Sequence, residues 1–308
     1  MTLVFSVRSK DSLWVVADRR LSYGGRRPVV DDAVKMTILE TADGVGVLTY
    51  AGLGATAKGT EPSEWMSAVL RGRRGLKFEQ SLGVLADVAT KELPRHLAPM
   101  PVGAHVIMIP AFIEGIGARL YSIDNVIDQQ TKQHWYRYTS HQITGLPGSP
   151  CPRIAIAGSG AAYIQSIDRA RKRALLSLVN ENDRGRVSDQ LIADQLAALN
   201  YETHRAVHDG TVGPRSIVVW RRRPEVGGRR GGGGHQFYTR ENRDRRDLPA
   251  IPTIGNGMDV SAVGGIFMDQ LHSKLTSESW PPANFDLDLE EIGRRLGALP
   301  DTPDEKLR

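Results

Sequence analysis

The sequence predicts an α+β protein built from two stacked sheets with pairs of helices outside them, followed by a C-terminal extension. Three observations carry this prediction: four short apolar segments open the chain, helical periodicity appears twice as a pair, and the composition changes after Arg223. The order is four strands, two helices, about four strands, two helices and a strand, which two face-to-face sheets would satisfy. A simpler α+β sheet would give a similar order.

The opening strands are apolar and largely lack polar alternation, which favours a sheet covered on both faces. Asp43-Gly44 supplies a hairpin turn between the third and fourth strand. The predicted opening strands are 3–7, 13–17, 33–39 and 45–50.

The remaining elements follow from helical spacing of apolar residues and from the return of β-prone segments. The predicted helices are 64–70, 78–93, 161–179 and 188–208, and the later strands are 105–112, 119–123, 135–138, 153–157 and 216–221.

The composition divides the chain into three parts. Residues 2–222 hold the predicted elements, 223–248 form a Gly/Arg-rich linker whose segment 227–234 is too poor in apolar residues to pack, and 249–308 form a C-terminal extension of unknown role.

Composition and charge exclude several classes of protein. No apolar stretch is long enough to span a membrane, and the N-terminus does not have the pattern of a secretory signal. Cys151 is the single cysteine, so no disulfide forms within the chain, and these features together favour the cytoplasm.

The net charge is +5, with much of the excess in arginine clusters. Because no nucleic-acid module accompanies these clusters, a solvated surface is favoured over a nucleic-acid interface. The histidines do not show metal-ligand spacing, and the glycine-rich turns lack the full phosphate-loop pattern. We therefore expect neither a metal nor a cofactor.

Thr2 is the candidate nucleophile. A threonine hydroxyl needs a base, and an N-terminal threonine supplies its own through the free α-amine, which titrates near pH 8. Thr2 reaches that position only if Met1 is removed, and a small second residue suits this removal. A nearby cation would keep the amine neutral, an acid would hold the cation, and a backbone N–H would face the oxyanion.

Each of these roles has a candidate at the end of an opening strand or within it. Asp18 and Arg20 end the second strand, Lys35 lies in the third, and Gly52 follows the fourth. Taken singly, an Asp–Arg pair, a strand lysine and a turn glycine are ordinary surface features, so only their combination favours a site.

The segments around these residues resemble the proteasome β-subunit family and the related bacterial peptidase rings. The resemblance is carried by Thr2-Leu3-Val4-Phe5, Val15-Val16-Ala17-Asp18-Arg19-Arg20, Val34-Lys35-Met36 and Thr49-Tyr50-Ala51-Gly52. It implies a four-layer αββα N-terminal nucleophile (Ntn) hydrolase sandwich with mainly antiparallel sheets. It also implies that Asp18 and Lys35 tune the amine, Arg20 supports the site and Gly52 binds the oxyanion.

Two later motifs continue the resemblance. Ile156-Ala157-Gly158-Ser159-Gly160 is similar to the family's turn into a helix, and the resemblance implies that Ser159 binds the nucleophile's amine. His208-Asp209-Gly210-Thr211-Val212-Gly213 is similar to its acidic loop, which makes Asp209 the second acid. The family usually has a serine where this chain has Val212, and Thr211 is the candidate substitute.

The predicted function is therefore a threonine-type endopeptidase. The resemblance implies a homo-oligomer of one ring or stacked rings that takes polypeptide or peptide substrates, with a possible ATPase partner. Two alternatives are a non-proteolytic Ntn amidase that acts on small molecules and a catalytically silent structural subunit.

Overall fold

The structure is a computed structural model. It describes residues 2–21, 30–52, 61–97, 105–127, 130–141, 153–224, 232–239, 242–243, 251–277 and 288–298. Among these residues, no helix is both long enough and apolar enough to cross a lipid bilayer.

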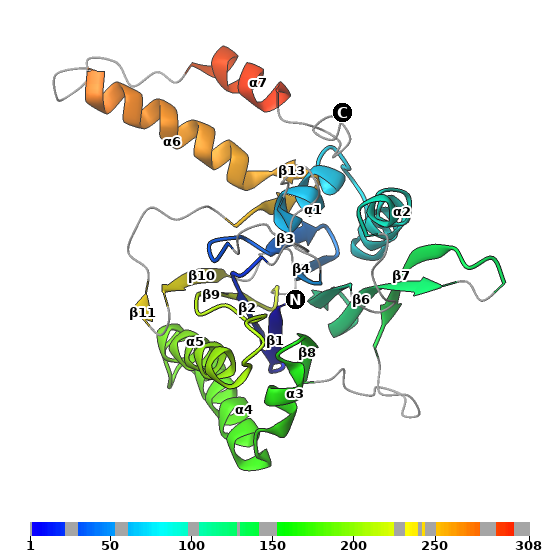
Figure 1. Ribbon diagram of the computed structural model, residues 1–308. Coiled ribbons are helices and arrows are strands. Elements are labelled where there is room, and N and C mark those ends of the chain that lie inside the picture. Colours follow the sequence, from blue (N-terminus) through cyan, green and yellow to red (C-terminus); the bar gives the residue numbers. More distant parts are fainter. Residues whose placement is uncertain are drawn as a thin grey trace.

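The strands form two sheets (Figure 1). The six-stranded sheet contains, in spatial order, β11 (Asn242–Arg243), β10 (Gly233–Thr239), β9 (Ser216–Arg222), β2 (Ser12–Asp18), β1 (Leu3–Arg8) and β8 (Ile154–Gly158). The seven-stranded sheet contains β13 (Met258–Asp259), β12 (Thr253–Gly255), β3 (Met36–Thr41), β4 (Gly44–Ala51), β5 (Val106–Ile113), β6 (Gly117–Ile127) and β7 (His134–Ser140). All described pairings are antiparallel except β12 with β3.

The two sheets share one hydrophobic core. Val4 and Val15 of the six-stranded sheet belong to the same buried cluster as Val47 and Met108 of the seven-stranded sheet. Removal of this apolar surface from water favours the stacking of the two sheets. The prediction of an α+β chain with two sheets is confirmed.

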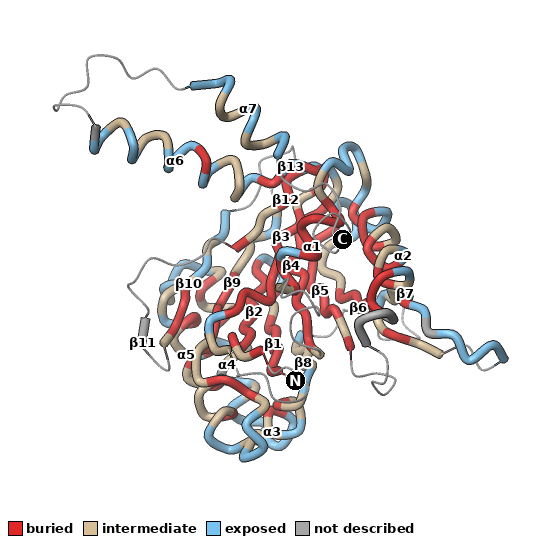
Figure 2. Tube along the Cα trace, turned by 45° about the horizontal axis from the view of Figure 1, so that its top comes forward, coloured by how far each residue is buried: buried red, intermediate tan, exposed pale blue. Residues whose placement is uncertain are grey.

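Helices pack on the outer side of each sheet. The structure describes α1 (Pro62–Leu70), α2 (Phe78–Leu97), α3 (Ala161–Ser166), α4 (Arg169–Asp183), α5 (Asp189–Ala206), α6 (Val260–Ser277) and α7 (Leu289–Gly297). A second cluster joins α1 and α2 to the seven-stranded sheet, and a third joins α3, α4 and α5 to the six-stranded sheet. Figure 2 shows the buried strands between these helices.

The predicted helix 161–179 is interrupted. It ends at Ser166 and restarts at Arg169, because the Asp168 side chain accepts a hydrogen bond from the Arg171 backbone N–H and so caps a new helix. The predicted hairpin between the third and fourth strands is confirmed, but its two-residue turn is Ala42-Asp43 rather than Asp43-Gly44, since Gly44 already pairs with Thr41.

Residues after 222 contribute to both sheets. The β10 strand pairs with β9 and places Phe237 in the core between the sheets, and β12 pairs in parallel with β3 and buries Ile254. These strands lie within the predicted linker and extension, whose boundaries at 222 and 248 stay predictions. Beyond them, α6 and α7 stand away from the sheets (Figure 1).

Candidate active site

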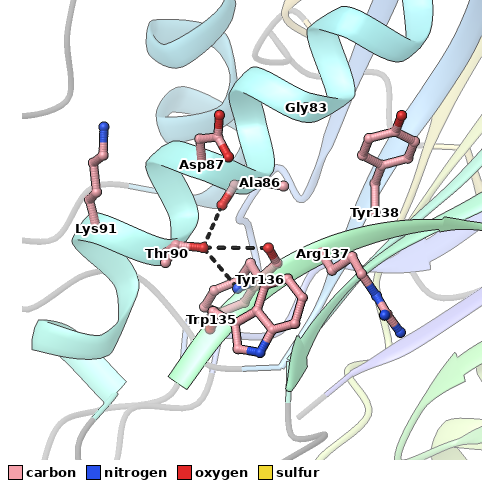
Figure 3. Close-up of a pocket in the computed structure, with 9 residues that line it drawn as sticks. All are labelled: Gly83, Ala86, Asp87, Thr90, Lys91, Trp135, Tyr136, Arg137 and Tyr138. Atoms are coloured by element: carbon pink, nitrogen blue, oxygen red, sulfur yellow. Dashed lines mark hydrogen bonds between the residues drawn. The ribbon is translucent and has the colours of Figure 1, made fainter. Parts of the chain in front are cut away.

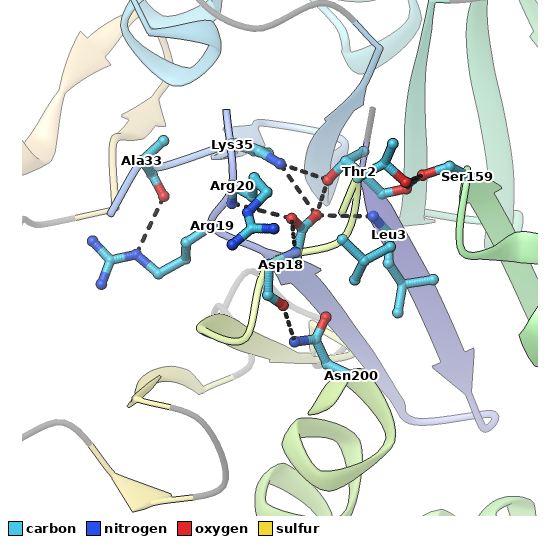
Figure 4. A network of polar contacts seen from close by, with 12 residues as sticks. Thr2, Leu3, Asp18, Arg19, Arg20, Ala33, Lys35, Ser159 and Asn200 are labelled. Carbon is cyan, nitrogen blue, oxygen red and sulfur yellow. Dashed lines mark hydrogen bonds and ion pairs between the residues drawn. The ribbon is translucent and has the colours of Figure 1, made fainter. Parts of the chain in front are cut away.

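Thr2 lies directly before β1 and is buried, with 1% of its surface exposed. Its Oγ1 accepts a hydrogen bond of 2.6 Å from Lys35 Nζ and donates to Asp18 Oδ1 (Figure 4). The structure therefore brings three of the predicted residues, from separate parts of the chain, into direct contact.

Asp18 is held by a ring of donors at the end of β2. Its Oδ1 accepts from Leu3 N at 2.8 Å and from Lys35 Nζ at 3.1 Å, in addition to Thr2. Its Oδ2 accepts from Arg20 N at 3.1 Å and from Gly213 N at 2.9 Å. Backbone and charged donors of this kind stabilise a buried carboxyl group, so the Asp18 side chain is held in place beside Thr2.

Lys35 immediately precedes β3, and its backbone oxygen accepts a hydrogen bond from Tyr50 N in β4. Burial lowers the pKa of the Lys35 ammonium below its usual value, and the neighbouring Asp18 carboxylate opposes that shift. A buried ammonium 2.6 Å from a hydroxyl oxygen stabilises negative charge that develops on that oxygen.

Arg20 supports the site through its backbone, while its side chain points elsewhere. The guanidinium makes two hydrogen bonds to Asp31, at 2.6 and 2.7 Å, and a third to the Gly210 oxygen at 2.7 Å. The hydrogen bonds from Arg20 lower the pKa of the Asp31 carboxyl. Arg20 thus ties the end of β2 to the loop that contains Asp209 and Gly213.

Ser159, Thr211 and Asp209 form a hydrogen-bonded chain. The Thr211 hydroxyl donates to Asp209 Oδ1 at 2.6 Å and lies 2.6 Å from Ser159 Oγ. Ser159 Oγ also lies 3.4 Å from the backbone oxygen of Thr2, and its one proton is shared between that oxygen and Thr211 Oγ1. Thr211 therefore connects Asp209 to Ser159. The Val212 side chain, in contrast, is buried in the cluster between the six-stranded sheet and its helices.

Gly158 allows the segment that contains Ser159 to pass close to Thr2. Its φ is +90°, and a Cβ at this position would lie 1.9 Å from the Thr2 backbone oxygen. Any other residue would displace the strand that precedes Ser159.

Gly52 directly follows β4, the strand that packs against β1 across the sandwich. Its φ of 145° is a conformation that residues with side chains rarely adopt.

His105 directly precedes β5, and its Nδ1 is 2.8 Å from the hydroxyl of Tyr50, near the end of β4. Burial lowers the pKa of His105 to about 4, so this imidazole is neutral at physiological pH.

A groove of about 520 Å³ lies elsewhere, between α2 and β7 (Figure 3). Thr90 in α2 accepts a hydrogen bond from the Tyr136 backbone N–H at 2.8 Å and so occupies the outer edge of β7. None of the predicted site residues lines this groove.

Within the described part of the chain, no group of three or more histidine, cysteine or acidic side chains could hold a metal ion.

Two contributors to the site were not predicted from the sequence. Asp31 holds the Arg20 side chain, and Gly213 donates its N–H to Asp18. Asp31 lies in an Asp-Asp pair before β3 and Gly213 ends the acidic loop, but neither position signals its partner in the sequence.

The comparisons with known proteins find solved structures of low similarity to this chain. No protein-family model matches the sequence, and no curated protein matches it. Among solved structures, the chain is similar to Anbu (ancestral beta-subunit) from Yersinia bercovieri, with 14% identity and a TM-score of 0.39 over 92% of this chain and 99% of that chain. It is also similar to Anbu from Hyphomicrobium sp. strain MC1, with 14% identity and a TM-score of 0.38 over 92% of this chain and 100% of that chain. A Gly-1 mutant of the Hyphomicrobium protein gives 13% identity and a TM-score of 0.39 over 93% and 100% of the two chains.

These findings correct the family assignment made from the sequence. The assignment to the proteasome β-subunit family is wrong, because no family model matches and these similar solved structures are Anbu proteins at low identity and low TM-score. The motifs behind the assignment are short strand ends and turns. Such segments are favoured wherever buried strands end in polar residues, so they do not identify a family.

Proposed function

We propose that the protein is an N-terminal nucleophile hydrolase that cleaves peptide bonds, with Thr2 as the attacking residue. The observation that carries the proposal is the buried contact of Thr2 Oγ1 with the Lys35 ammonium, 2.6 Å away, and with the Asp18 carboxylate. A nucleophile whose oxygen touches both a cation and an acid in a buried site has the arrangement that activation requires.

The first step of the proposed mechanism is cleavage of the bond between Met1 and Thr2, which frees the Thr2 amine. The amine accepts the Oγ1 proton as Oγ1 attacks the substrate carbonyl. The Lys35 charge beside Oγ1 stabilises the developing alkoxide, and it lowers the pKa of the amine so that the amine is neutral and basic.

The tetrahedral intermediate carries its negative charge on the former carbonyl oxygen. We assign the Gly52 N–H to this oxyanion, because a glycine after β4 leaves room for a substrate carbonyl to approach the backbone. The amine then protonates the leaving nitrogen, the amide bond breaks, and water hydrolyses the ester that remains on Thr2.

The proposed role of Ser159, Thr211 and Asp209 is to position the new N-terminus. Their chain of hydrogen bonds ends on the Thr2 backbone oxygen, so it fixes the peptide group next to the amine. Arg20 and Asp31 keep the loop with Asp209 against β2.

The proposal includes the four-layer αββα arrangement, which the three core clusters support. It also keeps a peptide as the substrate, because a threonine nucleophile requires an acyl group to attack. A ring assembly, an ATPase partner and a cytoplasmic location remain predictions of the sequence.

The direct test is labelling of the purified protein with an electrophilic peptide probe, followed by intact-mass and peptide mapping. We expect loss of one methionine residue and one probe on the amine or hydroxyl of Thr2, together with hydrolysis of fluorogenic peptides. Thr2→Ala is the control that should take no label. Retention of Met1 in the folded protein, or labelling elsewhere, contradicts the mechanism, whereas a labelled Thr2 without peptide hydrolysis assigns the site to small amides.

A further inference from the structure

Two side chains of α5 hold the loop that joins this helix to β9. The Val212 backbone oxygen lies 2.7 Å from His204 Nδ1, and the Gly213 oxygen accepts a hydrogen bond from Asn200 Nδ2 at 3.2 Å. Because a carbonyl oxygen only accepts, His204 Nδ1 is the donor in its pair. Asn200 and His204 are four residues apart and so lie on the same face of the helix. Two successive peptide groups of the loop are therefore anchored to one side of α5.

Gly213 connects this anchor to the candidate active site. Its backbone N–H donates to Asp18 Oδ2 at 2.9 Å, on the carboxyl group whose other oxygen contacts Thr2. A Cβ on Gly213 would lie 2.7 Å from Arg20 Cβ and 3.2 Å from Arg20 N, so the loop packs directly against the end of β2. The position of this one peptide segment thus sets where a donor to Asp18 points.

The Asn200 amide is fully buried, and only one of its two polar atoms has a partner. Its exposed fraction is 0%, and its Oδ1 has no hydrogen-bond partner among the residues that the structure describes. Figure 4 shows this side chain reaching from α5 toward the residues around Asp18. A buried polar atom without a partner destabilises a fold, and a leucine would fill the position without one. The hydrogen bond to Gly213 is therefore what the amide contributes here.

The same loop reaches Thr2 from a second direction. Asp209 and Thr211 lead to Ser159, whose Oγ lies 3.4 Å from the Thr2 backbone oxygen. A shift of the loop would disturb the Thr2 side chain through Asp18 and the Thr2 backbone through Ser159. Small displacements of a reacting group lower its rate strongly, so the position of this loop matters for chemistry at Thr2.

We propose that Asn200 and His204 are positioning residues for the reaction at Thr2. They fix two successive carbonyl groups of the loop, so that the Gly213 N–H stays directed at Asp18 and the carboxyl group keeps its other oxygen on Thr2. Both act through the backbone of the loop. The inference rests on the proposed function of Thr2, but the loop geometry that it describes can be measured without catalysis.

Site-resolved hydrogen exchange of the Gly213 amide tests the loop geometry in the full-length protein. Asn200→Leu keeps the volume of the side chain and removes the donor, so we expect about tenfold faster exchange at Gly213 than in the wild type. Thr203→Val is the matched control, because Thr203 is equally buried in α5 and its hydroxyl donates to the Leu199 oxygen within the helix. Exchange at the wild-type rate in Asn200→Leu, with a native circular dichroism spectrum, overturns the proposal.

Steady-state kinetics test whether the loop geometry serves the reaction. We expect Asn200→Leu to lower kcat for a fluorogenic peptide about tenfold, the loss that one hydrogen bond supports, and to change KM by less than about twofold. Thr203→Val should leave both constants unchanged. A role in stability alone would lower the urea midpoint of Asn200→Leu and leave kcat of the folded protein unaffected, and that result overturns the proposal.

His204 offers a milder pair of variants, because its side chain is half-buried and tolerates replacement. His204→Asn places an amide N–H near the position of Nδ1 and should retain the wild-type kcat. His204→Leu removes the donor and should lower kcat about fivefold. Equal kcat values for the asparagine and leucine variants contradict the role of His204.

Failure of the proposed function gives a different pattern from failure of this inference. A wild-type protein that takes no probe at Thr2 and hydrolyses no peptide refutes the reaction itself, and exchange at Gly213 then still decides whether α5 holds the loop. In an active protein, faster exchange at Gly213 with an unchanged kcat overturns the positioning role and leaves Thr2 as the nucleophile.

Discussion

Two clusters in this molecule contain a hydroxyl, an acid and a base, and they differ in how deeply these groups are buried. In the first, Thr2 lies between Lys35 and Asp18, and each of the three residues is at most 2% exposed. In the second, Ser122 of β6 lies 2.7 Å from His141 and donates its proton to Asp124. His141 is exposed and Asp124 is half-buried.

Burial separates the two clusters, because in both of them the hydroxyl donates its proton to an acid. In the second cluster the acceptor is Asp124, and Ser122 Oγ also lies 2.7 Å from His141. A serine nucleophile needs another order, with the histidine as base and the acid behind the histidine. Thr2 has a buried cation on its oxygen, and in the proposed mechanism its freed amine supplies the base, so the same residue types support chemistry in only one of the two clusters.

The largest expected difference follows from removal of each hydroxyl. Thr2→Ala should reduce hydrolysis of a fluorogenic peptide to background, because no other group replaces the nucleophile. Thr2→Ser should keep measurable activity. Ser122→Ala should retain the wild-type rate, and its loss of activity with a native fold would remove the distinction between the two clusters.

The next effect concerns the base or cation of each cluster. Lys35→Met should lower kcat by about 100-fold to 10,000-fold, the range typical of a group that assists proton transfer or stabilises charge. Lys35→Arg is the closer control and should not restore the rate, because a planar guanidinium does not fit the position of a buried ammonium. His141→Gln should leave kcat unchanged; a comparable loss in both variants would contradict the assignment.

Acid should destabilise the surroundings of the buried site through His105. The pKa of His105 is about 4 in the fold and near 6.5 in the unfolded chain, so the unfolded chain binds more protons between these values. Stability therefore falls as the pH decreases through this window. The pKa difference corresponds to about 2 kcal/mol between pH 7 and pH 5.

Urea unfolding at several pH values measures this effect. His105→Gln should reduce the loss of unfolding free energy between pH 7 and pH 5 by about 2 kcal/mol relative to the wild type. An identical pH dependence in the two proteins would show that another group controls acid stability.

The smallest effect concerns the chain from Asp209 to Thr2. Thr211→Val keeps the shape of the side chain and removes its hydroxyl, which costs about 1 kcal/mol for one hydrogen bond, or roughly a factor of five to ten in kcat. Thr211→Ser preserves the hydroxyl and should restore the rate. Equal rates for the valine and serine variants would show that Ser159 positions Thr2 without Thr211.

Much of the fold was predictable because buried strands and amphipathic helices are encoded locally. The opening strands, the hairpin between β3 and β4 and most of the helices follow from apolar spacing and turn residues. The contribution of β10 and β12 was not predictable. The β12 strand has only three residues, and Gly233 and Gly234 make β10 resemble a linker until pairing with β9 buries Phe237.

Within the site, Thr2, Asp18 and Lys35 could be proposed because each is a polar residue at the end of an apolar segment or inside it. The pairing of Arg20 with Asp31 could not, since it depends on the bridge between Leu21 and Val30, which brings Asp31 beside the end of β2. The sequence also did not predict the cluster of Ser122, Asp124 and His141, because this cluster depends on how β6 pairs with β7.

By itself, the sequence determined the α+β class with two sheets and the residue types of a hydroxyl, an acid and a lysine near strand ends. Tertiary structure alone decided which hydroxyl meets which partner: β1, β2 and the residue before β3 converge on buried Thr2, whereas pairing of β6 with β7 brings Ser122 beside the exposed His141. The physical reason is that local periodicity encodes burial, but the direction and strength of a hydrogen bond depend on contacts between residues far apart in the chain.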